Sequence, residues 1–170
     1  MRKLILFFLL SCFFGVAQNR DFFDVARNGS VAEAKIFFKQ DNSVVNALNN
    51  HGFSPLILAC YSSNLEIIDF LLENGADLNY VSQEGTALMA VTVKGNIQLV
   101  DLLLQKGANP NLTNANGITA LMYAVQFNNS EIVKKLLDNG ADKNILTDSG
   151  KSAFEYAVLA NNEQIINLLK

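Results

Sequence analysis

The segment FLLENGADLN, residues 70–79, returns in slightly altered form at two later places in the chain. The later copies are LLLQKGANPN at 102–111 and LLDNGADKN at 136–144. Their glycines are evenly spaced, since Gly107 follows Gly75 by 32 residues and Gly140 follows Gly107 by 33. A constant period in this range is the mark of a stacked array of structural repeats.

A second motif keeps the same period upstream of the first. Its copies are GFSPLILAC from Gly52, GTALMAV from Gly85, GITALMYAV from Gly117 and GKSAFEYAV from Gly150. The glycines lie 33, 32 and 33 residues apart, because one residue is missing directly after Gly85. A loop absorbs such a deletion more easily than a helix does, so we expect a hairpin at this place in each unit.

Each unit carries the end signals of two short helices. A hydroxyl residue precedes each first apolar run, where its oxygen can accept a bond from a free N–H group of the first turn: Ser54, Thr86, Thr119 and Ser152. A glycine follows each second apolar run, at the place where a left-handed conformation ends a helix: Gly75, Gly107 and Gly140. We therefore predict N-caps at the hydroxyl residues and turns at the glycines.

The helices themselves are expected to be short and to shelter one another. In the second unit the first helix is predicted at about 55–62, with Pro55 at a position where its missing N–H is harmless. The second helix is apolar on two edges, at Leu65, Ile67, Ile68, Phe70, Leu71 and Leu72. A helix this apolar is packed between neighbours, so the array rather than the single unit must fold.

These residues closely resemble the ankyrin repeat family, whose T-P-L-H-x-A signature recurs with a period of 33. The signature is matched by SPLILA at 54–59, TALMAV at 86–91, TALMYA at 119–124 and SAFEYA at 152–157. The resemblance implies an all-α repeat solenoid, in which helix-turn-helix units are joined by β-turn hairpins. It runs from about residue 21 to the C-terminus.

We divide the chain into a signal peptide at 1–17 and an ankyrin repeat domain at 18–170. Five units are expected, a degenerate one at about 21–48 and then 49–81, 82–113, 114–146 and a C-terminal cap at 147–170. The polar residues of the last helix suggest that the cap faces solvent: Glu163, Gln164, Asn167 and Lys170.

The chain departs from the family pattern in two respects. The signature histidine is absent from all four clear units, being replaced by Ile57, Met89, Met122 and Glu155. These units are therefore expected to depend more on apolar packing. The hairpin of the third unit is one residue short, and Pro110 stands where a β-branched residue is usual, so we expect looser geometry there.

The N-terminal segment MRKLILFFLLSCFFGVAQ has the order of a secretory signal peptide. Arg2 and Lys3 precede an apolar run, and the small residue Ala17 follows it. The run is shorter than the ~20 residues of a transmembrane helix. We predict cleavage after Ala17, no membrane insertion afterwards and a periplasmic or secreted protein of bacterial origin.

One alternative stays open within this segment. LLSC at residues 9–12 is similar to a bacterial lipobox, in which Cys12 would be lipidated and would become the first residue. The residues after Cys12 continue the apolar run, whereas lipoproteins usually turn polar there. Cleavage after Ala17 is therefore preferred, with a lipid anchor at Cys12 as the alternative.

No constellation typical of an enzyme is present in the sequence. HExxH, Gly-x-Ser-x-Gly, Walker and Gly-x-Gly-x-x-Gly motifs are all missing. One histidine, His51, and the one cysteine left after cleavage, Cys60, cannot complete a tetrahedral zinc site. We predict no enzyme activity, no metal and no cofactor. The alternative from a different functional class is a small enzyme domain whose activity the repeat pattern does not reveal.

Charge also limits the class of partner. The net charge of −3 becomes −5 once Arg2 and Lys3 are removed with the signal peptide. A mildly acidic chain without a basic cluster argues against nucleic acid and against an anionic membrane surface. We expect a protein partner of unknown identity, and a monomer, although no motif in the sequence determines the oligomeric state.

In ankyrin repeat proteins the partner binds the concave face, made by the hairpin tips and the exposed side of each first helix. Seven candidates occupy such places in this chain: Phe53, Tyr61, Ile118, Phe127, His51, Lys94 and Lys151. Adjacent exposed apolar groups mark interaction surfaces, and aromatic residues are favoured as anchors. The alternative is that the apolar candidates only pack against the next unit.

Between the apolar candidates lie Val93, Lys94 and the short third hairpin, so the patch is predicted to be split. The sequence thus predicts an exported, non-catalytic module that binds a protein through its concave face. Two roles remain open, a scaffold for another envelope protein and an inhibitor or immunity-type protein that blocks an enzyme or toxin. An acidic chain would suit a basic target in the second role.

Overall fold

The structure, a computed structural model, describes residues 20–170. The predicted signal peptide at 1–17 and the alternative lipid attachment at Cys12 lie outside the described residues. Within 20–170 the chain forms paired helices and one short 3-10 helix, η1 (Asn42–Asn46). The only strand-like pairing among these residues is an isolated antiparallel bridge between Ser82 and Gly85.

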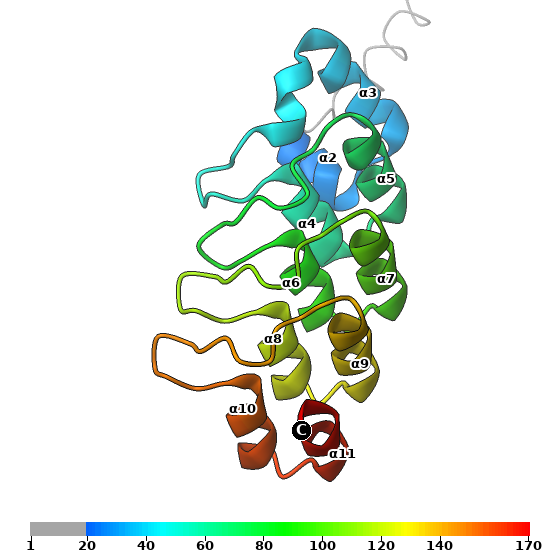
Figure 1. Cartoon of the computed structure of the whole chain (residues 1–170). Coiled ribbons are helices and arrows are strands. Elements are labelled where there is room, and N and C mark those ends of the chain that lie inside the picture. Colours follow the sequence, from blue (N-terminus) through cyan, green and yellow to red (C-terminus); the bar gives the residue numbers. More distant parts are fainter. Residues whose placement is uncertain (1–19) are drawn as a thin grey trace, which may run out of the picture.

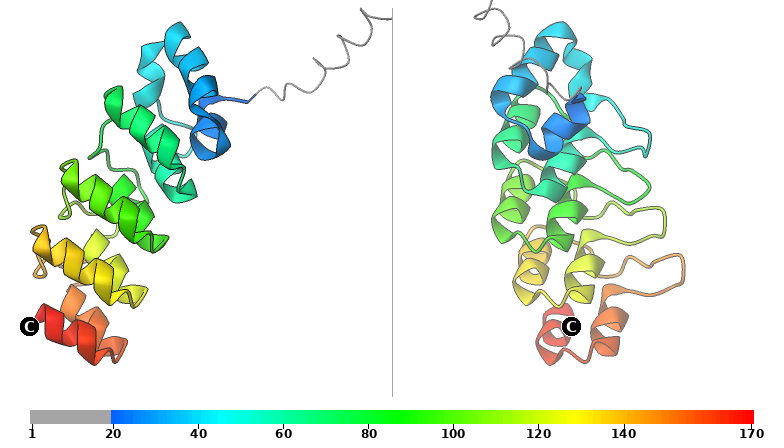
Figure 2. Two further views of the ribbon diagram at one scale, coloured as in Figure 1. Left: turned by 90° about the vertical axis from the view of Figure 1, so that its right-hand side faces the viewer. Right: turned by 180° about the vertical axis from the view of Figure 1, so that it is seen from behind.

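The helices alternate between two rows (Figures 1 and 2). The inner row lies beside the hairpins and consists of α2 (Phe22–Asn28), α4 (Pro55–Ser62), α6 (Ala87–Val93), α8 (Ala120–Gln126) and α10 (Ala153–Leu159). The outer row consists of α3 (Val31–Gln40), α5 (Leu65–Glu73), α7 (Ile97–Gln105), α9 (Ser130–Asp138) and α11 (Glu163–Leu169). Each inner helix packs against the next one along the array. The predicted all-α repeat solenoid is confirmed.

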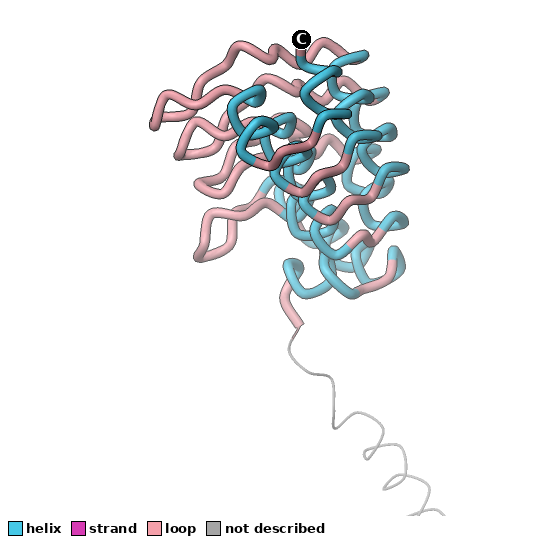
Figure 3. Tube along the Cα trace, turned by 90° about the horizontal axis from the view of Figure 1, so that it is seen from below, coloured by secondary structure: helices cyan, strands magenta, loops and turns pink. Residues whose placement is uncertain are grey.

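Hairpins project from the inner row on one side of the array, as Figure 3 shows with the loops in pink. Each hairpin leads directly into an inner helix, so the hairpins and the inner helices together form a continuous inner surface. This surface is the concave face that the family resemblance implied. The outer helices cover the opposite side.

Stacking of neighbouring units creates the core. Leu56, Leu88 and Leu121 hold the same position in successive inner helices and are at most 1% exposed. Burying a leucine side chain stabilises a fold by about 1.5–3 kcal/mol, and here a neighbouring unit supplies much of the cover. Ile57, Met89 and Met122 are also buried, as expected for apolar residues in place of the signature histidine.

The helix ends follow the local chemistry of the sequence. Ser54, Thr86 and Thr119 each accept a 3.3 Å bond from the backbone N–H three residues on. Ser152 does the same at 3.4 Å. The Glu155 carboxylate in turn accepts a bond from the Ser152 N–H, which completes a capping box. The turn glycines Gly75, Gly107 and Gly140 have φ of +84°, +93° and +82°, as a helix-ending turn requires.

Asparagine side chains connect consecutive units. Asn46, Asn79 and Asn111 each accept a bond of 2.7–2.8 Å from a backbone N–H of the next crossing segment. Asn46 belongs to η1 in the degenerate first unit, yet it makes the same bond as its counterparts. The first pair of helices is therefore joined to the second in the same way as the later units are joined.

Two expectations about local structure need correction. The third hairpin is not looser than the others, since both backbone bonds between Ser82 and Gly85 are present, at 3.0 and 3.1 Å. The polar residues predicted to face solvent in the last unit, Glu163, Gln164, Asn167 and Lys170, are indeed exposed on α11, and α10 also exposes Phe154 and Val158. These two apolar side chains are exposed because no further unit packs against α10 within the described residues. Leu65, predicted on an apolar edge, is 51% exposed.

Candidate binding groove

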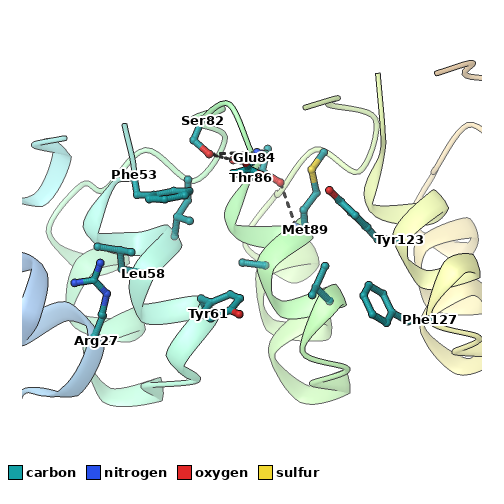
Figure 4. A pocket seen from close by; sticks show the side chains of 14 residues that line it. Arg27, Phe53, Leu58, Tyr61, Ser82, Glu84, Thr86, Met89, Tyr123 and Phe127 are labelled. Atoms are coloured by element: carbon teal, nitrogen blue, oxygen red, sulfur yellow. Dashed lines mark hydrogen bonds between the residues drawn. The ribbon is translucent and has the colours of Figure 1, made fainter. Parts of the chain in front are cut away.

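A hollow of about 510 Å³ lies on the inner surface and is lined by residues of the second, third and fourth units and by Arg27 of the first. Figure 4 shows Phe53 and Tyr61 on one side of it, Tyr123 and Phe127 on the other, and Met89 between them. The side walls are therefore aromatic and come from the second and fourth units. The floor comes from the third unit, through Met89, Ala90 and Val93 of α6.

Side-chain size explains why the hollow lies at the third unit. Ala90 stands where the neighbouring inner helices carry Leu58, Tyr123 and, further along, Tyr156. Val93 stands where α4 carries Tyr61. Smaller groups at these two positions leave space that the larger rings on both sides enclose.

The short hairpin removes a third side chain from the same place. Phe53, Ile118 and Lys151 each stand between a hairpin glycine and the N-cap residue, whereas Gly85 is followed directly by Thr86. The hydrogen bonds show the change, because Asn49 N–H reaches the carbonyl of Phe53, while Ser82 N–H already reaches that of Gly85. The third hairpin is thus one residue tighter, and no side chain projects over the hollow from this point.

Position 85 does not tolerate a side chain. Its φ is +122°, a backbone conformation that side chains rarely adopt, and a Cβ there would lie 2.2 Å from Met89 Sδ. The Ser82 hydroxyl donates a 2.8 Å bond to the Gly85 carbonyl, which holds the hairpin closed. The tight turn therefore lets Met89 lie under the hairpin as part of the floor.

The structure brings only some of the predicted site residues together. Phe53, Tyr61 and Phe127 line the hollow, and Lys94 Nζ lies 4.9 Å from the centre of the Tyr61 ring. Ile118, His51 and Lys151 do not line it: Ile118 is half-buried against the core, His51 is exposed at a hairpin tip, and Lys151 lies near Tyr156 of the last unit.

The prediction of a split patch is wrong. Val93 and the short third hairpin do not separate Phe53 and Tyr61 from Phe127, since Val93 and Ala90 form the floor between these rings. The seven predicted candidates do not include Arg27, Glu84 and Tyr123, which also line the hollow. A comparison of side-chain size at equal positions in successive units was the signal that could have found the hollow.

Exposure differs among the aromatic residues. Tyr61 and Phe127 are each 56% exposed, so their rings are open to a partner. Phe53 is half-buried and packs against the core, which makes it both a wall and a structural residue. The Tyr123 hydroxyl accepts a 3.1 Å bond from the Asn114 side-chain amide. Burial and, secondarily, the nearby Glu84 raise the pKa of Tyr123, so this phenol stays neutral at physiological pH.

Charged groups stand at opposite sides of the hollow. Arg27 lies in the last turn of α2 and Lys94 caps the C-terminal end of α6, so both cations lie at the helix side. Glu84 lies at the hairpin side. Arg27 is 3.6 Å from Asp24, a long ion pair that leaves most of its donors available.

The amino-acid comparison agrees with this architecture. Residues 22–82 and 87–170 match the family described as ankyrin repeats (3 copies), and the two segments cover most of the chain. The chain belongs to the ankyrin repeat family. Ankyrin repeats are generally protein–protein interaction modules and are typically non-catalytic.

A curated ankyrin repeat protein is similar to this chain over a shorter stretch. It is the rat protein named "Ankyrin repeat and SAM domain-containing protein 6" (Rattus norvegicus), which is 35% identical over 110 residues. The match covers 64% of this ankyrin repeat chain but only 12% of the relative. The likeness therefore concerns the repeats and not the rest of that protein.

Side chains with metal-binding chemistry do not gather in the described part of this ankyrin repeat protein. Residues 20–170 contain no cluster of three or more histidine, cysteine, aspartate or glutamate side chains able to hold a metal ion. The Cys60 thiol is fully buried, and burial raises its pKa, which disfavours the reactive thiolate form. None of the helices in this range has the length and apolar character of a membrane span.

Proposed function

We propose that this protein is a non-catalytic module that holds a protein partner against its concave face. The observation that carries the proposal is the aromatic-walled hollow, where Tyr61 and Phe127 remain more than half exposed. Large exposed rings beside a concave apolar surface are typical of interaction sites. The stacked helices hold these rings on a stiff support, which lowers the entropy cost of binding.

We further propose that the protein acts outside the cytoplasm, in the bacterial periplasm or after secretion. The support is the order of residues 1–17, with two basic residues, an apolar run and a small residue before the cleavage position. Fractionation of cells that make the tagged protein tests this part separately. A full-length protein retained in the cytoplasm would contradict it.

The role in the envelope is proposed as a scaffold or stabiliser of another protein. An inhibitor of a basic enzyme or toxin is the second candidate, favoured by the net charge of −5 after removal of Arg2 and Lys3. The identity of the captured protein separates the two roles. A scaffold should hold an envelope protein, whereas an inhibitor should abolish the activity of an enzyme.

The direct test is a crosslinked pull-down from envelope fractions, analysed by mass spectrometry. The double variant Tyr61→Ala/Phe127→Ala removes the two exposed rings and should lose most of the partner captured by the wild-type protein. Ile36→Ala is the matched control, because Ile36 is 58% exposed but lies on the outer helix α3. Capture of the same proteins by the double variant and the wild type would overturn the proposal.

Thermal unfolding shows whether the double variant is a fair test. Because both rings are 56% exposed, their removal should shift the melting temperature by only a few degrees. Phe53→Ala is unsuitable for this purpose, since Phe53 packs against the core and its loss would weaken folding as well.

A further inference from the structure

We propose that the hollow of the third unit receives one aromatic or large aliphatic side chain from an extended segment of the partner. An acidic residue next to that side chain would pair with Arg27 or with Lys94. This inference rests on the proposed function and deepens it, because it names the chemistry that the groove recognises. Three observations carry it: the composition of the hollow, its size and the placement of its charges.

The composition of the hollow favours an apolar group. Its walls are rings and its floor is Met89, Ala90 and Val93. The uncharged polar side chains at its edge each already make a hydrogen bond: the Ser82 hydroxyl donates to the Gly85 carbonyl, Thr86 accepts from Met89 N–H, and Tyr123 accepts from Asn114. An occupant with many polar groups would lose water without gaining hydrogen bonds, so an apolar side chain fits best.

The size of the hollow suits one large side chain with its neighbours on the segment. About 510 Å³ falls within the ~300–1,000 Å³ in which proteins enclose organic groups of moderate size. Aromatic anchors inserted in such pockets dominate the affinity of many protein interfaces. Rings from two units flank the floor from a third, so a single anchor would contact three consecutive units at once.

The charges define what should stand beside the anchor. Arg27 and Lys94 lie at the helix side, at the C-terminal ends of α2 and α6, and Glu84 lies at the hairpin side. A carboxylate next to the anchor is attracted to the helix side and repelled from the hairpin side. These charges would therefore determine in which direction the partner segment crosses the groove.

The test uses a phage-displayed library of random 12-residue peptides, selected against the immobilised protein. Selected peptides should share a large apolar residue with aspartate or glutamate within two positions of it. Peptides synthesised from this consensus are then measured by fluorescence anisotropy against defined variants. Consensus peptides without a large apolar residue, or with basic neighbours, would overturn the inference.

Ala90→Tyr fills the floor with the residue found at the same place in α8 and α10, Tyr123 and Tyr156. It should lower peptide affinity at least about tenfold, as loss of an anchor pocket does. Ala32→Tyr adds the same ring on the exposed surface of the outer helix α3 and should change affinity less than about twofold. Equal affinity for the wild type and Ala90→Tyr would overturn the inference.

A second route closes the hollow without touching the floor. Insertion of an isoleucine between Gly85 and Thr86 restores the Gly-x-Thr form of the fourth hairpin, where Ile118 occupies that place. It should weaken the same peptides, which keeps the inference testable if Ala90→Tyr folds poorly. Arg27→Glu should weaken the acidic consensus peptides and favour lysine or arginine in a new selection; an unchanged consensus would contradict the charge assignment.

The outcomes separate this inference from the proposed function. Peptides that need Tyr61 and Phe127 but bind Ala90→Tyr equally well would leave the protein-binding groove in place and remove the anchor. Failure of the double variant Tyr61→Ala/Phe127→Ala to affect either peptides or partner capture would remove both. A small molecule that copurifies with the wild type but not with Ala90→Tyr, seen by native mass spectrometry, would overturn the side-chain assignment.

Discussion

The third and fourth units share their cores but differ on their inner surfaces. Leu88 and Leu121 occupy the same buried position, and Thr86 and Thr119 cap their helices with bonds of the same length. On the inner surface, however, Ala90 corresponds to Tyr123, and the hairpin of the third unit lacks the counterpart of Ile118. At this position the fourth unit therefore carries an aromatic ring, whereas the third unit carries a small residue that forms part of the floor of the hollow.

This difference shows that backbone regularity and surface shape are controlled by separate positions. Residues between stacked units must keep their size, because each is covered by a neighbour. Residues on the inner surface face solvent, so a change from tyrosine to alanine leaves the stack intact and alters only the groove. The deletion of one loop residue likewise leaves the stack unchanged, since the shorter hairpin still closes with two backbone bonds between Ser82 and Gly85.

The largest effect is expected where the two units are alike. Leu88→Ala and Leu121→Ala should each lower the free energy of unfolding by about 2–5 kcal/mol, because each leaves a cavity between units. Urea unfolding followed by circular dichroism measures both. Phe154→Ala, at the same position in the last unit but 37% exposed, should cost clearly less. Equal losses at Phe154 and Leu121 would contradict the view that the next unit supplies the cover.

A smaller effect is expected in the fourth hairpin. Gly117 and Gly150 have nearly the same φ, +74° and +75°, so alanine carries the same backbone strain of about 1–2 kcal/mol at either place. At Gly117, however, the new Cβ would lie 2.8 Å from Asp148 N and 2.9 Å from Thr147 Cα. Gly117→Ala should therefore be the more destabilising of the two in urea. If both variants lose the same stability, contact between consecutive hairpins does not constrain this glycine.

The smallest effect concerns the capping of inner helices. Thr86 and Thr119 act alone, whereas Ser152 is joined by Glu155, whose pKa is lowered mainly by its bond from the Ser152 N–H. A lowered pKa in the folded state stabilises the fold above the unfolded value of about 4.5, and this contribution is lost as pH falls through the folded pKa. Glu155→Gln should be slightly less stable than the wild type at pH 7.

The pH dependence of that difference is the sharper measurement. The urea midpoints of the wild type and Glu155→Gln should converge as the pH is lowered from 7 toward 3, since the protonated glutamic acid then resembles the amide. A gap that persists unchanged at pH 3 would mean that the charge on Glu155 contributes nothing to the cap.

Much of the fold could be predicted because its signals are local. Ser54 and Pro55 mark the start of a helix through bonds and sterics within four residues, and Gly75 marks an end through its own φ. A constant period then fixes how such units stack. A degenerate first unit was expected at about 21–48, and there Asn46 accepts a bond from the Asp77 N–H as its later counterparts do from the units that follow them.

The candidate site was predicted only in part, since it depends on contacts between units. Phe53, Tyr61 and Phe127 were predicted because their positions within the repeat place them on the inner surface. The position within the repeat does not tell how much of each ring is exposed to solvent. Phe53 is half-buried against the core. The hollow was missed because it results from three absent or small side chains, which a search for conspicuous residues overlooks.

The amino-acid sequence by itself determined the repeat, the helix ends and the family, because these depend on interactions between residues close in the chain and on a strict period. Only the tertiary structure decided that Ala90 and Val93 are a floor rather than a gap between two patches, and that Arg27 and Glu84 stand on opposite sides of it. The physical reason is that a concave surface is made by side chains from successive units that meet only after stacking, and its shape depends on their relative sizes.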